Sequence, residues 1–183
     1  MRLIAFSDAH GDIGLVRLVR EKSVQADVVV CCGDFTPRVG TSQSIVKEMG
    51  KIRNRLLIVL GNAETPEEIG NLAREYGWTD IHGGVVDVEG VVFAGCGGSG
   101  ITPFNTAFEM QEEEIERLLA RFKDLKDFIL VSHSPPEGGC RYRHNQPHRV
   151  EGRQEICRED SAHSMHLWPR PRMRGSRRDC RRY

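Results

Sequence analysis

Side chains that can bind metal follow four apolar runs of this 183-residue chain, each where the run stops. Asp8 and His10 come after the first run, Asp34 after the second, Asn62 after the third and His133 after the fourth. Carboxylate oxygen, imidazole nitrogen and amide oxygen form a mixed set of ligands. Such a set suits Mn²⁺, Fe, Zn²⁺ or Co²⁺ better than a thiolate site does. The sequence therefore predicts a metal site if the fold brings these side chains together.

The apolar runs are predicted to be buried strands of an α/β domain. They alternate with segments whose apolar residues recur at helical spacing, and a Glu-Gly turn indicates one hairpin. The expected strands cover residues 2–7, 27–34, 56–62, 85–88, 91–94 and 128–133, and the expected helices cover residues 13–24, 41–54, 65–78 and 109–127. Strand carboxyl ends in open α/β sheets face one crevice, so we expect the polar side chains to converge there.

Each of these features also has an ordinary explanation when it is taken alone. An Asp-x-His sequence after a strand is commonly a turn aspartate and a surface histidine. Gly-Asp and Gly-Asn are common turn dipeptides, and His133 alone could be a core histidine. The order of all the candidates, each at a strand end, favours the functional interpretation.

Four short motifs in this order resemble four of the five motifs of calcineurin-like metallophosphoesterases. The motifs are Asp8-Ala9-His10, Gly33-Asp34, Gly61-Asn62-Ala63-Glu64 and His133-Ser134-Pro135. The resemblance is closest to the small single-domain prokaryotic members, and GGSGITPFNT at 97–106 resembles their glycine-rich loop. It covers residues 1–139 and implies two facing mixed sheets flanked by helices, a two-sheet αββα sandwich.

The resemblance also implies a chemistry and a role for each matching residue. Asp8 and His10 would hold a first divalent metal, Asn62 and His133 a second, and Asp34 would bridge the two. The ions would be Mn, Fe, Zn, Ni or Co, and a hydroxide held by both would hydrolyse a phosphomonoester or phosphodiester. The implied substrate is a small phosphate ester or a nucleotide-like molecule.

Two departures from the family pattern predict a weakened activity. Ala63 stands where many members have the histidine that protonates the leaving group, and a methyl group cannot transfer a proton. The fifth motif, Gly-His-x-His, is absent from residues 140–183, so each metal would lack one histidine. Glu64 matches the acidic position of the family, and its ordinary alternative is to help start the helix at Thr65.

The charge balance divides the chain into a predicted domain, 1–139, and a predicted tail, 140–183. The first part carries 14 basic and 21 acidic residues, whereas the second carries 12 arginines and 5 acidic residues. An alternative function is therefore a non-catalytic scaffold whose arginine-rich tail binds nucleic acid or another polyanion. A zinc site is a further alternative for six tail residues, Cys140, His144, His148, Cys157, His163 and His166. Their spacing fits no usual zinc finger.

The tail is predicted to be either disordered or a frame-shifted reading of the family's own last segment. The codons for Trp168–Pro171, read one nucleotide later, permit Gly-His-Val-His, which is the missing motif. The αββα fold is then expected to be incomplete at its C-terminus, and the nucleotide sequence would decide. No apolar run is long enough to span a bilayer, and Asp8 precedes any signal-peptide core, so we expect a cytoplasmic protein without a membrane partner.

Overall fold

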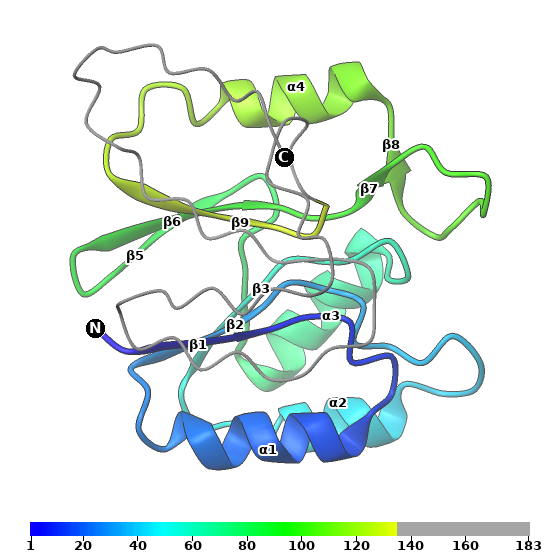
Figure 1. Cartoon of the computed structure of the whole chain (residues 1–183), viewed down its shortest axis with the longest axis vertical. Helices are drawn as coiled ribbons and strands as arrows, with labels where there is room; N and C mark the ends of the chain where they lie inside the picture. Colours follow the sequence, from blue (N-terminus) through cyan, green and yellow to red (C-terminus); the bar gives the residue numbers. More distant parts are fainter. Residues whose placement is uncertain (135–183) are drawn as a thin grey trace, which may run out of the picture.

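Two β-sheets face each other in the computed structural model, and helices cover their outer faces (Figure 1). The structure describes residues 1–134. The predicted tail at 140–183, its frame-shifted reading and its binding to nucleic acid concern residues outside this described part. Among residues 1–134, no helix is long and apolar enough to cross a membrane. The layered arrangement confirms the predicted αββα sandwich.

The first sheet is parallel throughout and has the strand order β1-β2-β3-β4. Its strands are β1 (Leu3–Phe6), β2 (Val28–Cys31), β3 (Arg55–Ile58) and β4 (Thr79–Asp80). The central strands pair in register, with Ala5 beside Val30 and Val30 beside Leu57. Since parallel neighbours end at the same edge, the residues that follow β1, β2 and β3 lie next to one another.

The second sheet is mixed and has the order β5-β6-β9. The expected hairpin is present, with β5 (Val85–Val88) antiparallel to β6 (Val91–Cys96). Strand β9 (Phe128–Ser132) lies parallel to β6 and ends directly before His133. Two short strands, β7 (Ser99–Gly100) and β8 (Glu109–Met110), pair beyond the end of β6.

Four helices complete the layers of the described part. Helices α1 (Ile13–Ser23), α2 (Gln43–Met49) and α3 (Pro66–Tyr76) pack on the first sheet, and α4 (Glu112–Ala120) lies over the second (Figure 1). The start of α3 is a capping box, as its Thr-Pro-Glu-Glu sequence predicts. The Thr65 hydroxyl accepts from the Glu68 amide, and the Glu68 carboxylate accepts from the Thr65 amide.

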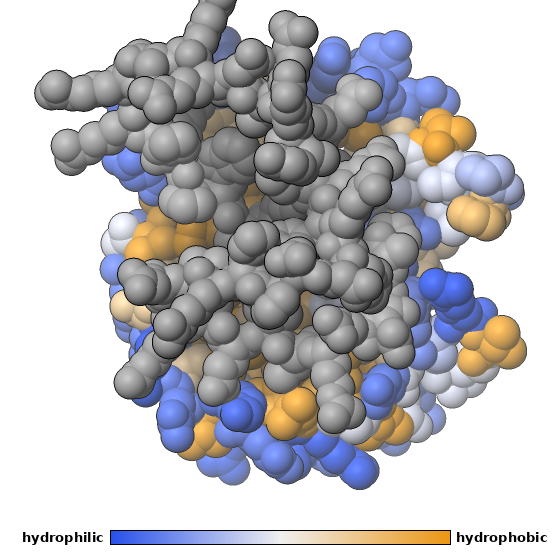
Figure 2. Space-filling view, in the orientation of Figure 1, coloured by the Kyte–Doolittle hydropathy of each residue, from blue (hydrophilic) through white to orange (hydrophobic). Residues whose placement is uncertain are grey.

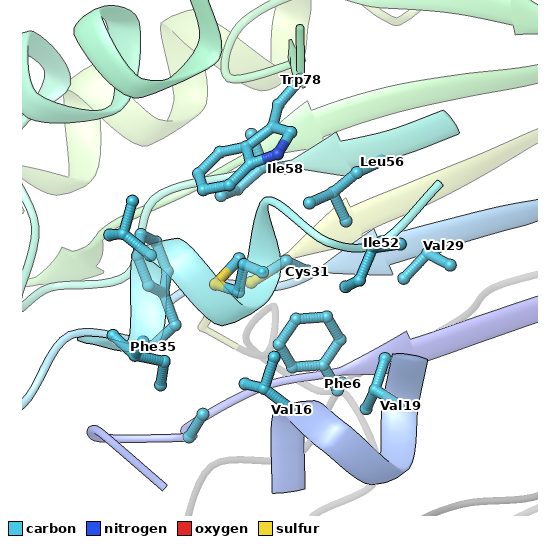
Figure 3. Close-up of a cluster of buried hydrophobic side chains, with 14 of the residues drawn as sticks. Phe6, Val16, Val19, Val29, Cys31, Phe35, Ile52, Leu56, Ile58 and Trp78 are labelled. Carbon is cyan, nitrogen blue, oxygen red and sulfur yellow. The ribbon is translucent and has the colours of Figure 1, made fainter. Parts of the chain in front are cut away.

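The core follows from the strict alternation of side chains along β2. Val29 and Cys31 point toward the helices, where they join a cluster with Phe6, Val16 and others (Figure 3). Val28 and Val30 point the other way and pack in the cluster between the two sheets. All four β2 side chains are fully buried because both faces of this strand are covered. A continuous apolar run such as VVVC is typical of this situation.

Figure 2 shows one face of the molecule, where the visible apolar residues of the described part lie among polar ones. Scattered exposed apolar residues are normal for a protein surface and need no special function. Two of the most exposed, Val39 and Phe104, belong to loops rather than to the faces of helices or strands. The apolar material of the described part is therefore concentrated between the layers.

All four helices of the described part are shorter than the sequence patterns predict, and the difference is largest for α2 and α4. Helix α2 covers 43–49 rather than 41–54, because after Gly50 the backbone bonds change to the tighter i→i−3 pattern, from the Lys51 amide to the Glu48 carbonyl and from the Ile52 amide to the Met49 carbonyl. Helix α4 covers 112–120 rather than 109–127. Glu109 and Met110 form β8, and after Ala120 the chain continues in turns with i→i−3 bonds, such as that from the Phe122 amide to the Leu119 carbonyl. Gln111 and Glu114 form the capping box that begins α4 instead. The start of α4 is therefore determined by a contact outside the helix, the pairing of β8 with β7.

Candidate metal centre

The candidate site lies at the carboxyl ends of four strands. Asp8 follows β1, Asp34 follows β2, Asn62 follows β3 and His133 follows β9. Strands β1, β2, β3 and β9 end on the same side of the molecule, so the polar residues that follow them meet there (Figure 1). Asp34 and His133 are 4% and 2% exposed, which places this polar group at the inner edge of the core.

Asp34 lies at the centre of this polar group. Its Oδ2 atom is 3.8 Å from Nε2 of His10, and its Oδ1 atom is 3.7 Å from Nε2 of His133. On one side, Oδ1 of Asp8 is 3.7 Å from His10 Nε2. On the other side, Oδ1 of Asn62 is 3.0 Å from His133 Nε2. The structure thus brings all five predicted side chains together, and their role as metal ligands stays a prediction.

A cation fits the donor atoms on the His133 side. Nδ1 of His133 lies 2.8 Å from the Cys32 carbonyl oxygen, which can only accept, so Nδ1 carries the proton. In the neutral ring, Nε2 then presents its lone pair to oxygens of Asn62 and Asp34. Ligand atoms from Asp8, Asp34 and His133 all lie within 4.8 Å of one another. Acceptors that converge in this way are the arrangement that a metal ion satisfies.

A positive charge already approaches the His10 side. Nη2 of Arg38 lies 3.4 Å from Nε2 of His10, whose ring is also near the carboxylates of Asp8 and Asp34. Nδ1 of His10 is buried and has no hydrogen-bond partner among the described residues. The anionic surroundings of this imidazole therefore suit a cation, and Arg38 is the cationic side chain that the fold brings there.

The backbone of three candidate ligands has an uncommon conformation. Asp8, His10 and Asp34 have positive φ angles of 54°, 41° and 53°. Such conformations cost roughly 1–3 kcal/mol each and persist only where neighbours hold them. Here the Asp8 amide donates to the Gly33 carbonyl at 3.0 Å, and the His10 amide donates to the Asp34 carbonyl at 2.9 Å. The sharp turns direct these side chains toward one point.

Glycines precede Asp34 and Asn62 because the ends of β2 and β3 approach too closely for a side chain. A Cβ atom at Gly33 would lie 2.2 Å from the Gly61 amide nitrogen, and φ of Gly33 is +90°. A Cβ atom at Gly61 would lie 1.9 Å from Oδ1 of Asp34. The Gly-Asp and Gly-Asn pairs are therefore more than turn dipeptides, because they allow two ligand loops to pack backbone against backbone.

Comparison with known proteins decides the family. The family model described as calcineurin-like phosphoesterase matches residues 1–161.

The chain belongs to the calcineurin-like phosphoesterases.

This family acts on phosphate esters and binds divalent metals, which agrees with the donor set above. The matched range extends past residue 139, where the sequence motifs place the end of the domain, and that boundary stays a prediction.

Two relatives illustrate the likeness. The uncharacterized protein MJ1162 of Methanocaldococcus jannaschii is 38% identical over 139 residues, which are 74% of this chain and 62% of MJ1162. This chain therefore spans less than two thirds of that relative. The crystal structure of TT1561 of Thermus thermophilus has a TM-score of 0.59 and 19% identity. It is matched over 75% of this chain and 70% of its own, and this likeness shows the shared fold.

In this member of the family, Glu64 has contacts that sequence reasoning missed. Its side chain is fully buried, and its carboxylate accepts hydrogen bonds from Asp34, Thr36 and Gly61. The Glu64 carboxylate therefore bonds to the loops after β2 and β3, and the capping box at the start of α3 is formed by Glu68 with Thr65. The signal available in the sequence was an acidic residue two positions after a candidate ligand, in a segment otherwise read as a helix start.

The glycine-rich loop at 97–106 and the residue pair that follows it are hydrogen-bonded to the segment after β3 that carries Asn62. The Gly98 amide donates to the Leu60 carbonyl at 2.9 Å, and the Phe108 amide donates to the Asn62 carbonyl at 3.1 Å. Just after the loop, the Glu109 carboxylate in β8 accepts bonds from Thr102 and Thr106. These bonds, that of the Thr102 hydroxyl first, lower the pKa of Glu109 to about 2. The loop is thus braced close to Asn62.

Cysteines beside the site are unsuited to metal binding or redox chemistry. Burial raises the pKa of the Cys31 thiol well above its ordinary value and that of Cys32 to about 12. Cys96, at the end of β6, has its pKa raised by burial to about 11. Thiolates are the metal-binding form of cysteine, so these three thiols stay protonated and inert at neutral pH. The oxygen and nitrogen donors remain the candidate ligands within the described residues.

Proposed function

We propose that this protein is a metal-dependent phosphoesterase that holds two divalent ions. Asp8 and His10 would bind one ion, Asn62 and His133 the other, and Asp34 would bridge them. The observation that carries the proposal is the direction of the two Asp34 oxygens, since Oδ2 is near His10 and Oδ1 is near His133. A carboxylate placed between two ligand groups is what a pair of mutually repelling cations needs.

The chemistry divides between the ions and the chain. When bound, divalent ions supply an acidified water as nucleophile and neutralise the phosphoryl oxygens. The chain's part is to orient the ligands, which the Cys32 carbonyl does for His133 through Nδ1 at 2.8 Å. Arg38 adds a guanidinium beside His10, where it can pair with phosphate oxygens of a bound ester. The proposed substrate is a small phosphomonoester or phosphodiester, or a nucleotide-like molecule.

The proposed activity depends on the leaving group because of Ala63. The Ala63 amide donates to Oδ1 of Asp34 at 2.9 Å, so the backbone supports the ligand while the methyl side chain transfers no proton. Proton donation to a leaving oxygen is typically worth on the order of 10²–10⁴ in rate. A nitrophenolate leaving group departs without this help, whereas an alkoxide does not. The enzyme should therefore hydrolyse nitrophenyl esters faster than alkyl esters.

The direct test measures hydrolysis and metal binding on the same preparation of the full chain. We expect Mn²⁺-dependent cleavage of a nitrophenyl phosphate or a bis-nitrophenyl phosphate, and loss of this activity in Asp34→Ala. Asp80→Ala is the matched control, because Asp80 lies in β4 and its carboxylate accepts from the His82 amide. Absence of turnover with each of Mn²⁺, Fe²⁺, Zn²⁺, Co²⁺ and Ni²⁺ would refute the proposal. Salt-sensitive nucleic-acid binding without turnover would instead support the scaffold with a polyanion-binding tail.

A further inference from the structure

Glu64 is a buried anion that connects two of the ligand loops. Its Oε2 atom accepts from the amide of Asp34 at 2.9 Å and from the amide of Gly61 at 2.8 Å. Its Oε1 atom accepts from the amide and the hydroxyl of Thr36, at 2.9 and 2.8 Å. An ionised carboxylate has about four acceptor positions, so this set of donors saturates it. The Glu64 side chain is 0% exposed, and the donors therefore replace its water entirely.

The contacts of Oε2 determine how β2 and β3 end relative to each other. One oxygen atom holds Asp34, the residue that faces both histidines, and also Gly61, the neighbour of Asn62. Asp34 has a φ of 53°, a conformation that requires external support. A rotation of its peptide would redirect both carboxylate oxygens. Glu64 therefore influences the position of Asp34 through the main chain, and is not itself one of the candidate ligands.

The negative charge of Glu64 should favour cation binding, in addition to the effect of its hydrogen bonds on the position of Asp34. No cationic side chain pairs with it within residues 1–134, so its negative charge is solvated by dipoles alone. A buried carboxylate that accepts from the Asp34 amide makes the surroundings more favourable for bound cations. An uncharged amide of the same size would lose that attraction. It would also turn an NH₂ group toward backbone donors.

We propose that Glu64 is a positioning residue that sets the spacing between the two metal positions. This inference rests on the proposed function for the existence of the two metals. It assigns their spacing to Glu64, through the single carboxylate oxygen shared by the Asp34 and Gly61 amides. Without the two hydrogen bonds to Glu64 Oε2, the loop that carries Asp34 can move relative to the loop that carries Asn62. The affinity for the second ion and the coupling between the ions should then fall together.

The test measures Mn²⁺ binding to full-length chains by electron paramagnetic resonance, without reference to turnover. The signal of free Mn²⁺ gives the stoichiometry and affinity, and the exchange-coupled signal reports two ions held close together. Outer groups that orient metal ligands are typically worth about 10- to 100-fold in affinity. In Glu64→Gln we expect a loss of this size for the second ion, together with loss of the coupled signal. Glu68→Gln is the control, because Glu68 only caps α3.

A second variant covers the case in which Glu64→Gln does not fold, as judged by circular dichroism. Glu64→Asp keeps the charge but is shorter by one methylene, so its carboxylate cannot reach all four donors. We expect the same loss of coupling in this variant, with less loss of folded protein. Folded Glu64→Gln or Glu64→Asp that binds two coupled Mn²⁺ ions with wild-type affinity would overturn the inference. Binding of two coupled ions by the wild type without any ester hydrolysis would refute the proposed function and leave this inference intact.

Discussion

Replacement of Gly61 by alanine tests the close approach of the two ligand loops. The new Cβ atom would lie 1.9 Å from Oδ1 of Asp34 and 2.4 Å from the Asp34 amide nitrogen. Contacts of a real Cβ atom below 3.0 Å are essentially never seen, so the backbone at Asp34 must move by about half an ångström or more. The carboxylate of Asp34 must also rotate away from its present direction.

The magnitude follows from two contributions. Insertion of an extra carbon into a well-packed region costs about 1–3 kcal/mol. The displacement also weakens the bonds that cross this point, from the Gly61 amide to Glu64 and from the Ala63 amide to Asp34. A hydrogen bond to a charged group contributes about 1.5–3 kcal/mol. Loss of one such bond brings the expected destabilisation of Gly61→Ala to roughly 2.5–6 kcal/mol, a large share of the usual stability of a domain.

The assay is urea denaturation followed by circular dichroism, with Mn²⁺ binding measured on the folded protein. Gly70→Ala is the matched control, because Gly70 lies within α3 and a Cβ atom there would meet nothing within 4 Å. Alanine inside a helix is favoured over glycine by roughly 0.5–1 kcal/mol, so the control should be more stable than the wild type. The same glycine-to-alanine change is thus expected to lower the free energy of unfolding at position 61 and to raise it at position 70.

The reasoning would be refuted if Gly61→Ala had the same midpoint of urea denaturation as the wild type and bound Mn²⁺ with the same affinity. Such a result would mean that the loops after β2 and β3 separate at no cost. A destabilised Gly61→Ala with intact Mn²⁺ binding would show that the close approach serves stability alone. Destabilisation of Gly70→Ala would instead indicate that helix propensity is not limiting in α3.

Three further predictions concern other parts of the molecule. The pKa of Glu109 is lowered in the folded state to about 2, so its stabilising effect should be complete above its ordinary value of 4.5 and disappear as the pH falls toward 2. The melting temperature of the wild type should therefore fall more steeply than that of Glu109→Gln over this range, and parallel curves would contradict the assignment. Thr65→Ala removes the N-cap of α3 and should lower the free energy of unfolding by about 1 kcal/mol in urea denaturation, whereas an unchanged midpoint would argue that the cap is dispensable. Ala63→His should narrow the rate difference between nitrophenyl and alkyl phosphate esters, and equal rates on both esters in the wild type would show that no proton donor is missing.

The elements and the candidate ligands could be predicted from the sequence because they depend on local patterns. A continuous apolar run such as VVVC predicts a strand buried on both faces, and β2 confirms it. The Thr65 cap of α3 involves residues three positions apart, so it too can be read directly. Polar residues where apolar runs stop indicate the crevice, because parallel strands end together. The identity of the five candidates therefore required no coordinates.

The tertiary structure alone decided which groups support those candidates. Glu64 meets donors from Asp34 and Thr36, which lie 30 and 28 positions away in the chain and become neighbours only when β2 pairs with β3. Arg38 reaches His10 across a similar separation. Glu109 leaves the expected helix because the loop at 97–106 supplies its hydrogen bonds. Periodicity and capping act within a few residues, whereas the burial of a charge depends on which strands lie side by side, and that is a property of the folded chain.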